Sequence, residues 1–134
     1  MTFWDYYQKK IQPQVMQADI FFRTEQEPYD LQKVVKQFSL SKDIRKQCDK
    51  KTLTKTECIQ LLKNHDTCFG KLLSRQLQSG FPAYYTMAQI SYIYDLDIQL
   101  VEQAAEQTGL FHCSERLLPL LFSAVNLSQT QYRL

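Results

Sequence analysis

The sequence predicts an all-α protein, a compact single-domain array of five to seven helices. Three observations lead to this fold class. Apolar residues recur at the three- and four-residue spacing of a helical face along most of the chain. Several pairs of residues three positions apart suit the first turn of a helix. The chain of 134 residues has only 3 glycines and 4 prolines, which leaves few places for the tight turns of a sheet.

The chain length fits one domain. We assign residues 1–127 to a single helical domain and residues 128–134 to a polar C-terminal tail, which we expect to fray. No internal repeat is evident in the sequence.

The stretch 86–109 predicts a helix-turn-helix-like hairpin. Thr86 and Gln89 form a capping-box pattern at the start of its first helix. Asp95 and Leu96 are the expected turn, and Asp97 is a good N-cap for the second helix. Val101 is expected to be buried between the two helices. Gly109 suits the left-handed position just past a helix end.

This pattern resembles the generic helix-turn-helix motif of many bacterial regulators, because apolar residues stand where that motif requires them (Ile90, Tyr94, Leu96 and Val101). Asp95 occupies the turn position where the motif usually has glycine. The resemblance implies DNA binding by the second helix. The charge opposes it, because the sequence from Gln76 through Glu115 contains no Lys or Arg. A packed helical hairpin, a protein-binding surface and a DNA reader therefore stay open.

The first half of the chain predicts three further helices. An apolar face extends from Trp4 to Phe22, and Pro13 should kink or split this helix. Pro28 is expected in the first turn of a helix that buries Leu31, Val34, Val35 and Phe38. Ser41 is expected to cap a short helix that ends near Asp49.

Two more helices are expected in the second half of the chain. Thr54 and Glu57 form a capping box. We favour one long helix from there to Gly80, and the alternative is a break at residues 64–67. The last helix is expected to begin near Leu118, because Pro119 fits poorly inside a helix.

Charge is distributed unevenly along the chain. Residues 1–75 hold 14 of the 16 basic and 9 of the 14 acidic residues, whereas residues 76–134 have a net charge of −3. The basic residues are densest at positions 33–55. No apolar run is long enough to cross a bilayer, and the N-terminal sequence does not have the pattern of a signal peptide. We therefore expect a cytoplasmic protein whose four cysteines are free thiols.

Motifs for catalysis or cofactor binding were not found in the sequence. It contains no glycine-rich phosphate loop, no HExxH and no nucleophile elbow. Cys58, His65 and Cys68 could share a zinc ion, but they lack the paired spacing of structural zinc ligands. We expect no metal, no cofactor and no enzymatic activity.

The interpretation that we favour is a small non-catalytic regulatory or adaptor protein that binds a macromolecule, most readily a protein. An inhibitor from a host or mobile-element system would fit the composition. The expected contact residues are Tyr85, Tyr92, Asp95 and Asp97, because tyrosine rings with nearby acids suit a basic partner. The alternative is a helix-turn-helix DNA-binding regulator with phosphate contacts from the segment 33–55, at Lys42, Arg45, Lys46, Lys50 and Lys51.

Overall fold

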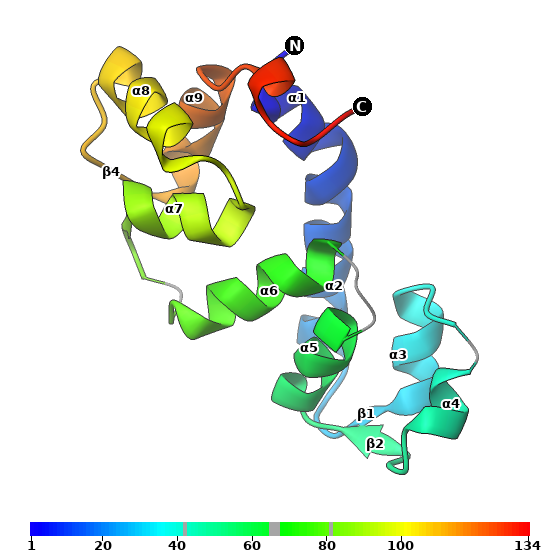
Figure 1. Ribbon diagram of the computed structural model, residues 1–134. Coiled ribbons are helices and arrows are strands. Elements are labelled where there is room, and N and C mark those ends of the chain that lie inside the picture. The colour runs from blue at the N-terminus through cyan, green and yellow to red at the C-terminus, as the bar shows by residue number, and fades with distance from the viewer. Residues whose placement is uncertain (42, 65–67, 81) are drawn as a thin grey trace. The chain divides into compact units, whose positions relative to one another are not determined.

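The computed structural model describes residues 1–41, 43–64, 68–80 and 82–134, without the side chains of residues 45, 47, 68, 69 and 77. It is 65% helical, which confirms the predicted all-α class (Figure 1). The longer helices of the described chain are α2 (Gln12–Thr24), α3 (Leu31–Gln37), α5 (Lys55–Asn64), α6 (Cys68–Gln78), α7 (Met87–Tyr94), α8 (Ile98–Thr108) and α9 (Leu118–Ser123). Two shorter ones are α1 (Phe3–Tyr6) and α4 (Ile44–Gln47).

Two short antiparallel strand pairs were not predicted. Strand β1 (Tyr29–Asp30) pairs with β2 (Thr52–Leu53), and β3 (Tyr85–Thr86) pairs with β4 (His112–Cys113). Each strand is two residues long, which is too short to show the alternating apolar pattern that identifies strands in a sequence.

The contacts within the chain group into two compact units. Unit 1 contains residues 1–13 and 75–134, and unit 2 contains residues 14–74. The assignment of residues 1–127 to one domain stays a prediction.

The N-terminal helix contains a wide turn at the predicted interruption. Between α1 and α2 the chain forms a π-helical segment, Tyr7–Ile11, and the amide of Gln12 donates to the carbonyl of Tyr7. Pro13 follows immediately and has no amide to donate to an α-helical carbonyl, so the wider turn avoids a break. The extra residue shifts the buried face, and Phe3 and Phe21 are buried rather than Trp4.

The predicted place of Pro28 is wrong. Helix α3 begins at Leu31, after strand β1, so Pro28 does not lie in its first turn. The N-cap residue of the helix is Asp30. The side chain of Asp30 accepts a hydrogen bond from the amide of Lys33 at 3.3 Å. The predicted core face is confirmed, because Leu31, Val34 and Val35 are buried.

The favoured single helix from Lys55 to Gly80 is also wrong. Helix α5 ends at Asn64 and α6 begins at Cys68, while residues 65–67 lie outside the described part of the chain. A Cβ atom on Gly70 would overlap the backbone carbonyl of Leu62 and lie 2.7 Å from the nitrogen of Lys63. In one straight helix the eight residues from Leu62 to Gly70 would span about 12 Å. The helices α5 and α6 are therefore separate, and they touch through their backbones at Gly70.

Each unit contains a segment with the same order of helices and strands, although no repeat was evident in the sequence. We call residues 29–64 the first module, made of β1, α3, α4, β2 and α5. We call residues 85–123 the second module, made of β3, α7, α8, β4, a short 3-10 turn and α9. In both modules a strand leads into a helix pair, and a second strand returns to pair with the first.

The strand pairs and caps of the two modules correspond residue by residue. Tyr29 pairs with Leu53 in the first module, as Tyr85 pairs with Cys113 in the second. All four of these side chains are buried. The residue after each tyrosine caps the following helix, and its side chain accepts from the amide three residues later, at 3.3 Å and 3.1 Å.

The turns between the paired helices also correspond. Ser39 lies two residues after the end of α3 and Asp95 lies directly after α7. Their left-handed φ angles are 53° and 52°, and they are the non-glycine residues with positive φ in the described chain. The next residue is leucine in both modules. The amides of Leu40 and Leu96 each donate to the carbonyl five residues earlier, at 2.9 Å and 3.0 Å. The modules are thus two copies of one structural pattern, with different side chains on it.

The C-terminal segment packs against the core of unit 1. Thr130 is buried, and the Tyr132 ring packs 4.8 Å from the Tyr6 ring and 5.3 Å from the Phe3 ring, centroid to centroid. The Tyr132 hydroxyl donates to the carbonyl of Tyr94 at 2.5 Å. An aromatic residue supplies apolar surface to the core of unit 1 even within a segment that is polar in composition.

Candidate functional site

The predicted helix-turn-helix-like hairpin is present in the second module as helices α7 and α8. The Thr86 hydroxyl accepts from the amide of Gln89, whose side chain accepts in return from the amide of Thr86 at 2.8 Å. Asp97 caps α8 by accepting from the amide of Gln99 at 2.8 Å. Val101 is fully buried, as expected for the residue between the two helices.

Asp95 takes the left-handed conformation that glycine usually supplies at such a turn. The side-chain amide of Gln131 donates to the carbonyl of Asp95 at 2.7 Å and to its carboxylate at 3.3 Å. The turn is further closed by the Ser91 hydroxyl, which donates to the carbonyl of Leu96 at 2.6 Å. The carboxylates of Asp95 and Asp97 therefore have structural roles, and both residues also stay exposed to solvent.

The predicted contact set does not form one exposed face. Tyr92, Asp95 and Asp97 are exposed, whereas Tyr85 is only 4% exposed. The expectation that Tyr85 shares a surface with Tyr92 is wrong, because Tyr85 lies in β3 and pairs with Cys113. Burial raises the pKa of the Tyr85 hydroxyl, and the charge of Glu115 raises it further.

Tyr92 is held in place by residues from helix α6. The Arg75 guanidinium lies 5.0 Å from the centroid of the Tyr92 ring and donates to the carbonyl of Tyr92 at 2.8 Å. The Tyr92 hydroxyl donates to the side chain of Gln78, also at 2.8 Å. These contacts fix the ring while leaving the residue 51% exposed. The sequence did not indicate them, because Arg75 and Gln78 are distant from Tyr92 along the chain.

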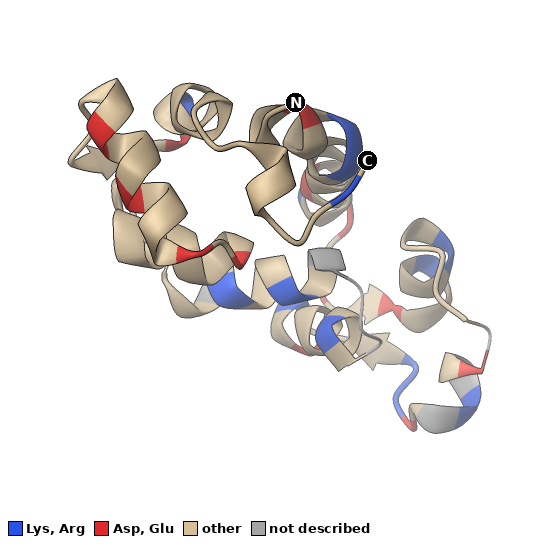
Figure 2. Cartoon of the chain, turned by 45° about the horizontal axis from the view of Figure 1, so that its top comes forward, with Lys and Arg blue, Asp and Glu red and all other residues tan. Residues whose placement is uncertain are grey.

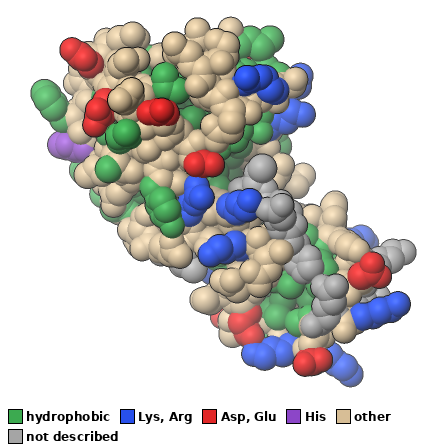
Figure 3. Space-filling view, viewed as in Figure 1, with side chains coloured by type: hydrophobic (Ala, Val, Ile, Leu, Met, Phe, Trp, Pro, Cys, Tyr) green, Lys and Arg blue, Asp and Glu red, His purple; other side chains and the backbone are tan. Residues whose placement is uncertain are grey.

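Exposed aromatic residues near the strand pair of the second module do not belong to the contact set predicted from the sequence. Tyr84 precedes β3 and is 61% exposed, and Phe111 precedes β4 and is 91% exposed. The exposed His112 ring lies 5.4 Å from the Tyr84 ring in an edge-to-face arrangement. We call Tyr84, Phe111 and His112 the aromatic edge. Figure 3 shows a histidine at the left margin of the molecule with hydrophobic side chains beside it.

The charge around these residues is acidic. Four exposed acids belong to the turn and to helix α8: Asp95, Asp97, Glu102 and Glu106. Figure 2 shows acidic positions along this helix pair. Glu115 follows β4 and is exposed as well, and Arg116 is the first basic residue after Arg75. A phosphate backbone would be repelled here, while a basic partner would be attracted.

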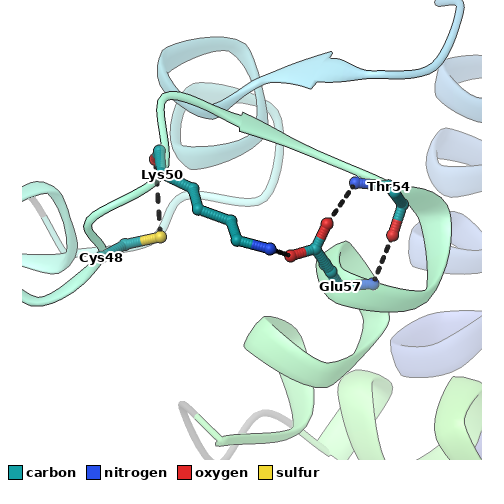
Figure 4. A network of polar contacts seen from close by, with 4 residues as sticks. All are labelled: Cys48, Lys50, Thr54 and Glu57. Atoms are coloured by element: carbon teal, nitrogen blue, oxygen red, sulfur yellow. Dashed lines mark hydrogen bonds and ion pairs between the residues drawn. The ribbon is translucent and has the colours of Figure 1, made fainter.

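The basic segment of the first module is only partly available for a ligand. Lys46, Lys50 and Lys51 are exposed. Lys50 forms an ion pair with Glu57, which also accepts from the amide of Thr54 at 3.1 Å (Figure 4). This pairing raises the pKa of Lys50 and lowers the pKa of Glu57. Lys42 and the side chain of Arg45 lie outside the described residues.

Acidic residues alternate with the free lysines of this segment. Asp43 and Asp49 are exposed on either side of Lys46. The Cys48 thiol donates to the carbonyl of Lys50 at 3.5 Å, so it turns inward on the loop (Figure 4). The exposed charge is therefore mixed in sign, which makes a weaker electrostatic attraction for nucleic acid than the lysine count alone indicated.

The two buried thiols, Cys58 and Cys113, are inert in character. Burial raises the pKa of Cys58 to about 12 and the pKa of Cys113 to about 11, so the nucleophilic thiolate is strongly disfavoured in both. The zinc alternative also needs His65 and Cys68, of which His65 and the Cys68 side chain lie outside the described residues. Among the residues that are described, no three potential ligands come together to hold a metal ion.

Within the described residues, no helix is long and apolar enough to cross a membrane. Comparison with family models gives no match, and comparisons with curated proteins and with solved structures give none either.

Proposed function

We propose that the protein is a non-catalytic regulatory or adaptor protein of the cytoplasm that binds a protein partner through the second module. One observation carries the proposal. This module combines an exposed ring with acidic charge, because the exposed Tyr92 is followed within five residues by the exposed carboxylates of Asp95 and Asp97. Rigid tyrosine rings contribute much of the binding energy at protein interfaces, and Tyr92 is already fixed by Arg75.

The negative charge of this surface favours a positively charged partner. Between residues 76 and 115 the chain has five acids and no Lys or Arg, so a basic protein surface is complementary to it. An enzyme is not favoured, because the buried Cys58 and Cys113 thiols are protonated at neutral pH and a catalytic pair of groups is not evident in the described chain.

In the alternative hypothesis, the protein binds DNA through the basic residues of the first module. It depends on Lys46 and Lys51, which are exposed, and on Lys42 and Arg45. A role as an inhibitor in a host or mobile-element system is compatible with either binding mode and is equally a proposal.

Two matched double variants separate these hypotheses. Asp95→Asn with Asp97→Asn removes two negative charges, and asparagine still suits both the left-handed turn and the helix cap. Lys46→Gln with Lys51→Gln removes two exposed positive charges. We expect the first variant to lose a protein partner captured from a native extract treated with nuclease, and the second to keep it. Loss of a nucleic-acid partner by the lysine variant alone would contradict the proposed function.

A further inference from the structure

The two modules provide an internal comparison for the aromatic edge. In the first module, Pro28 immediately precedes β1, as Tyr84 precedes β3. Lys51 precedes β2 and Thr52 begins it, so these two residues correspond to Phe111 and His112. All three are exposed, as are Tyr84, Phe111 and His112. The same backbone pattern therefore forms with small or charged side chains at these places.

The comparison shows that the aromatic rings are not required by the fold of the module. The buried partners of the strand pairs correspond in the two modules, whereas the exposed residues beside them differ in kind. Phe111 is 91% exposed, so its ring contributes little to the core while presenting apolar surface to water. An exposed ring of this sort, next in sequence to the exposed His112 and Tyr84 ring pair, marks an interaction surface.

We propose that the aromatic edge is a docking surface for a basic segment of a partner protein, with an apolar side chain of that segment seated on the Phe111 ring. This inference rests on the proposed function and names the centre of the contact with its basic partner. The proposed contact surface therefore includes the aromatic edge as well as the residues of the helix pair that the sequence indicated, Tyr92, Asp95 and Asp97.

Charge complementarity identifies the occupant. Helix α8 leads directly to Phe111 and presents Glu102 and Glu106 to solvent, and Glu115 follows the edge on the other side. These exposed carboxylates precede and follow the edge along the chain, and they would attract lysine or arginine side chains of a partner. Nucleic acid would meet the same carboxylates with its phosphates, so the charge disfavours it.

The test uses two short synthetic peptides with the same number of lysines, one alternating Lys with Leu and the other alternating Lys with Ser. Each is titrated into the isotope-labelled full chain, and amide and ring resonances are followed by NMR. We expect the Lys–Leu peptide to shift the resonances of Phe111 and His112, and the Lys–Ser peptide to bind about tenfold more weakly. Raised salt should weaken both.

Two variants define the site. Phe111→Lys gives the second module the residue type that Lys51 supplies at the corresponding place of the first. We expect it to weaken binding of the Lys–Leu peptide by about tenfold. Lys51→Ala is the matched control at the corresponding place, and it should leave the affinity unchanged. Because both residues are exposed, both variants should keep the wild-type circular dichroism spectrum.

Four outcomes overturn the inference. The first is the absence of shifts at the aromatic edge, and the second is unchanged affinity of Phe111→Lys. The third is concentration-dependent broadening of the Phe111 resonances without peptide, which would assign the edge to a second copy of this chain. The fourth is a stronger effect of duplex DNA at these residues. If Phe111→Lys keeps a native partner that Asp95→Asn with Asp97→Asn loses, the proposed function stands and the aromatic edge is not its centre.

Discussion

Ser39 and Asp95 have the same backbone conformation at corresponding places in the two modules. Their φ angles are 53° and 52°, and each is followed by a leucine whose amide donates to the carbonyl five residues earlier. The left-handed conformation costs an ordinary L-residue roughly 1–2 kcal/mol, and less for aspartate. The turn of each helix pair thus contains one residue in a strained backbone conformation.

Ser39→Gly is expected to stabilise the protein. Glycine relieves the left-handed strain but gains freedom in the unfolded chain, so the net increase in unfolding free energy should be about 0.5–1 kcal/mol. Chemical denaturation measures it. Ser39→Val at the same place should lower the unfolding free energy, because a β-branched side chain strongly disfavours this conformation. A glycine variant less stable than the wild type would show that the turn has another geometry.

Gly70→Ala distinguishes the two-helix arrangement from a single long helix by the sign of its effect. Next to the Leu62 backbone a methyl group has no space, so the variant should lose about 2 kcal/mol or more of stability. In one exposed continuous helix the same change would stabilise by about 1 kcal/mol. Gly80→Ala is the control, because a Cβ there meets nothing within 4 Å and only its φ of 72° opposes the change.

Tyr132→Ala is expected to destabilise unit 1. The change removes the ring packed on Phe3 and Tyr6 and the hydrogen bond to the carbonyl of Tyr94. We expect a loss of about 2–3 kcal/mol, seen as a lower melting temperature. Tyr132→Phe keeps the ring and should lose only about 1 kcal/mol. A melting temperature unchanged in the alanine variant would restore the expectation of a frayed tail.

Cys58 should make the protein less stable in alkaline solution. Burial raises its pKa to about 12 from the ordinary 9.0. Below pH 9.0 the thiol is neutral in both states, so its contribution is fully present. As the pH rises from 9.0 toward 12 the unfolded chain releases the proton first, and the unfolding free energy falls. Cys58→Ala should therefore show a shallower loss between these pH values, measured by urea denaturation at each pH. An equal slope in both proteins would contradict the buried thiol.

The sequence predicted the helices where local signals are strong. The capping boxes at Thr86 and Thr54 and the buried face from Leu31 to Val35 are confirmed, because capping and periodicity depend on residues within one or two turns. The helix-turn-helix-like hairpin follows from the same local rules.

Features that depend on distant contacts were missed. The separation of α5 and α6 is seen only when Gly70 meets Leu62, and the burial of Tyr132 only when the chain ends meet. The repeat was hidden because corresponding places hold different side chains, as at Asp30 and Thr86. Of the predicted contact residues, Tyr85 was misplaced by an unrecognised two-residue strand. The exposure of Phe111 had no local signal, since an apolar residue in a loop reads equally well as core.

Photo-crosslinking at corresponding places of the two modules tests the central claim most directly. A photoreactive phenylalanine analogue replaces Phe111 in one full-length protein and Lys51 in another, and each is irradiated in native extract. The account predicts a protein adduct at position 111, with a Lys- or Arg-rich crosslinked peptide identified by mass spectrometry and competed by unlabelled wild type. At position 51 it predicts none above background. Adducts confined to position 51, or adducts to nucleic acid, would contradict docking through the second module.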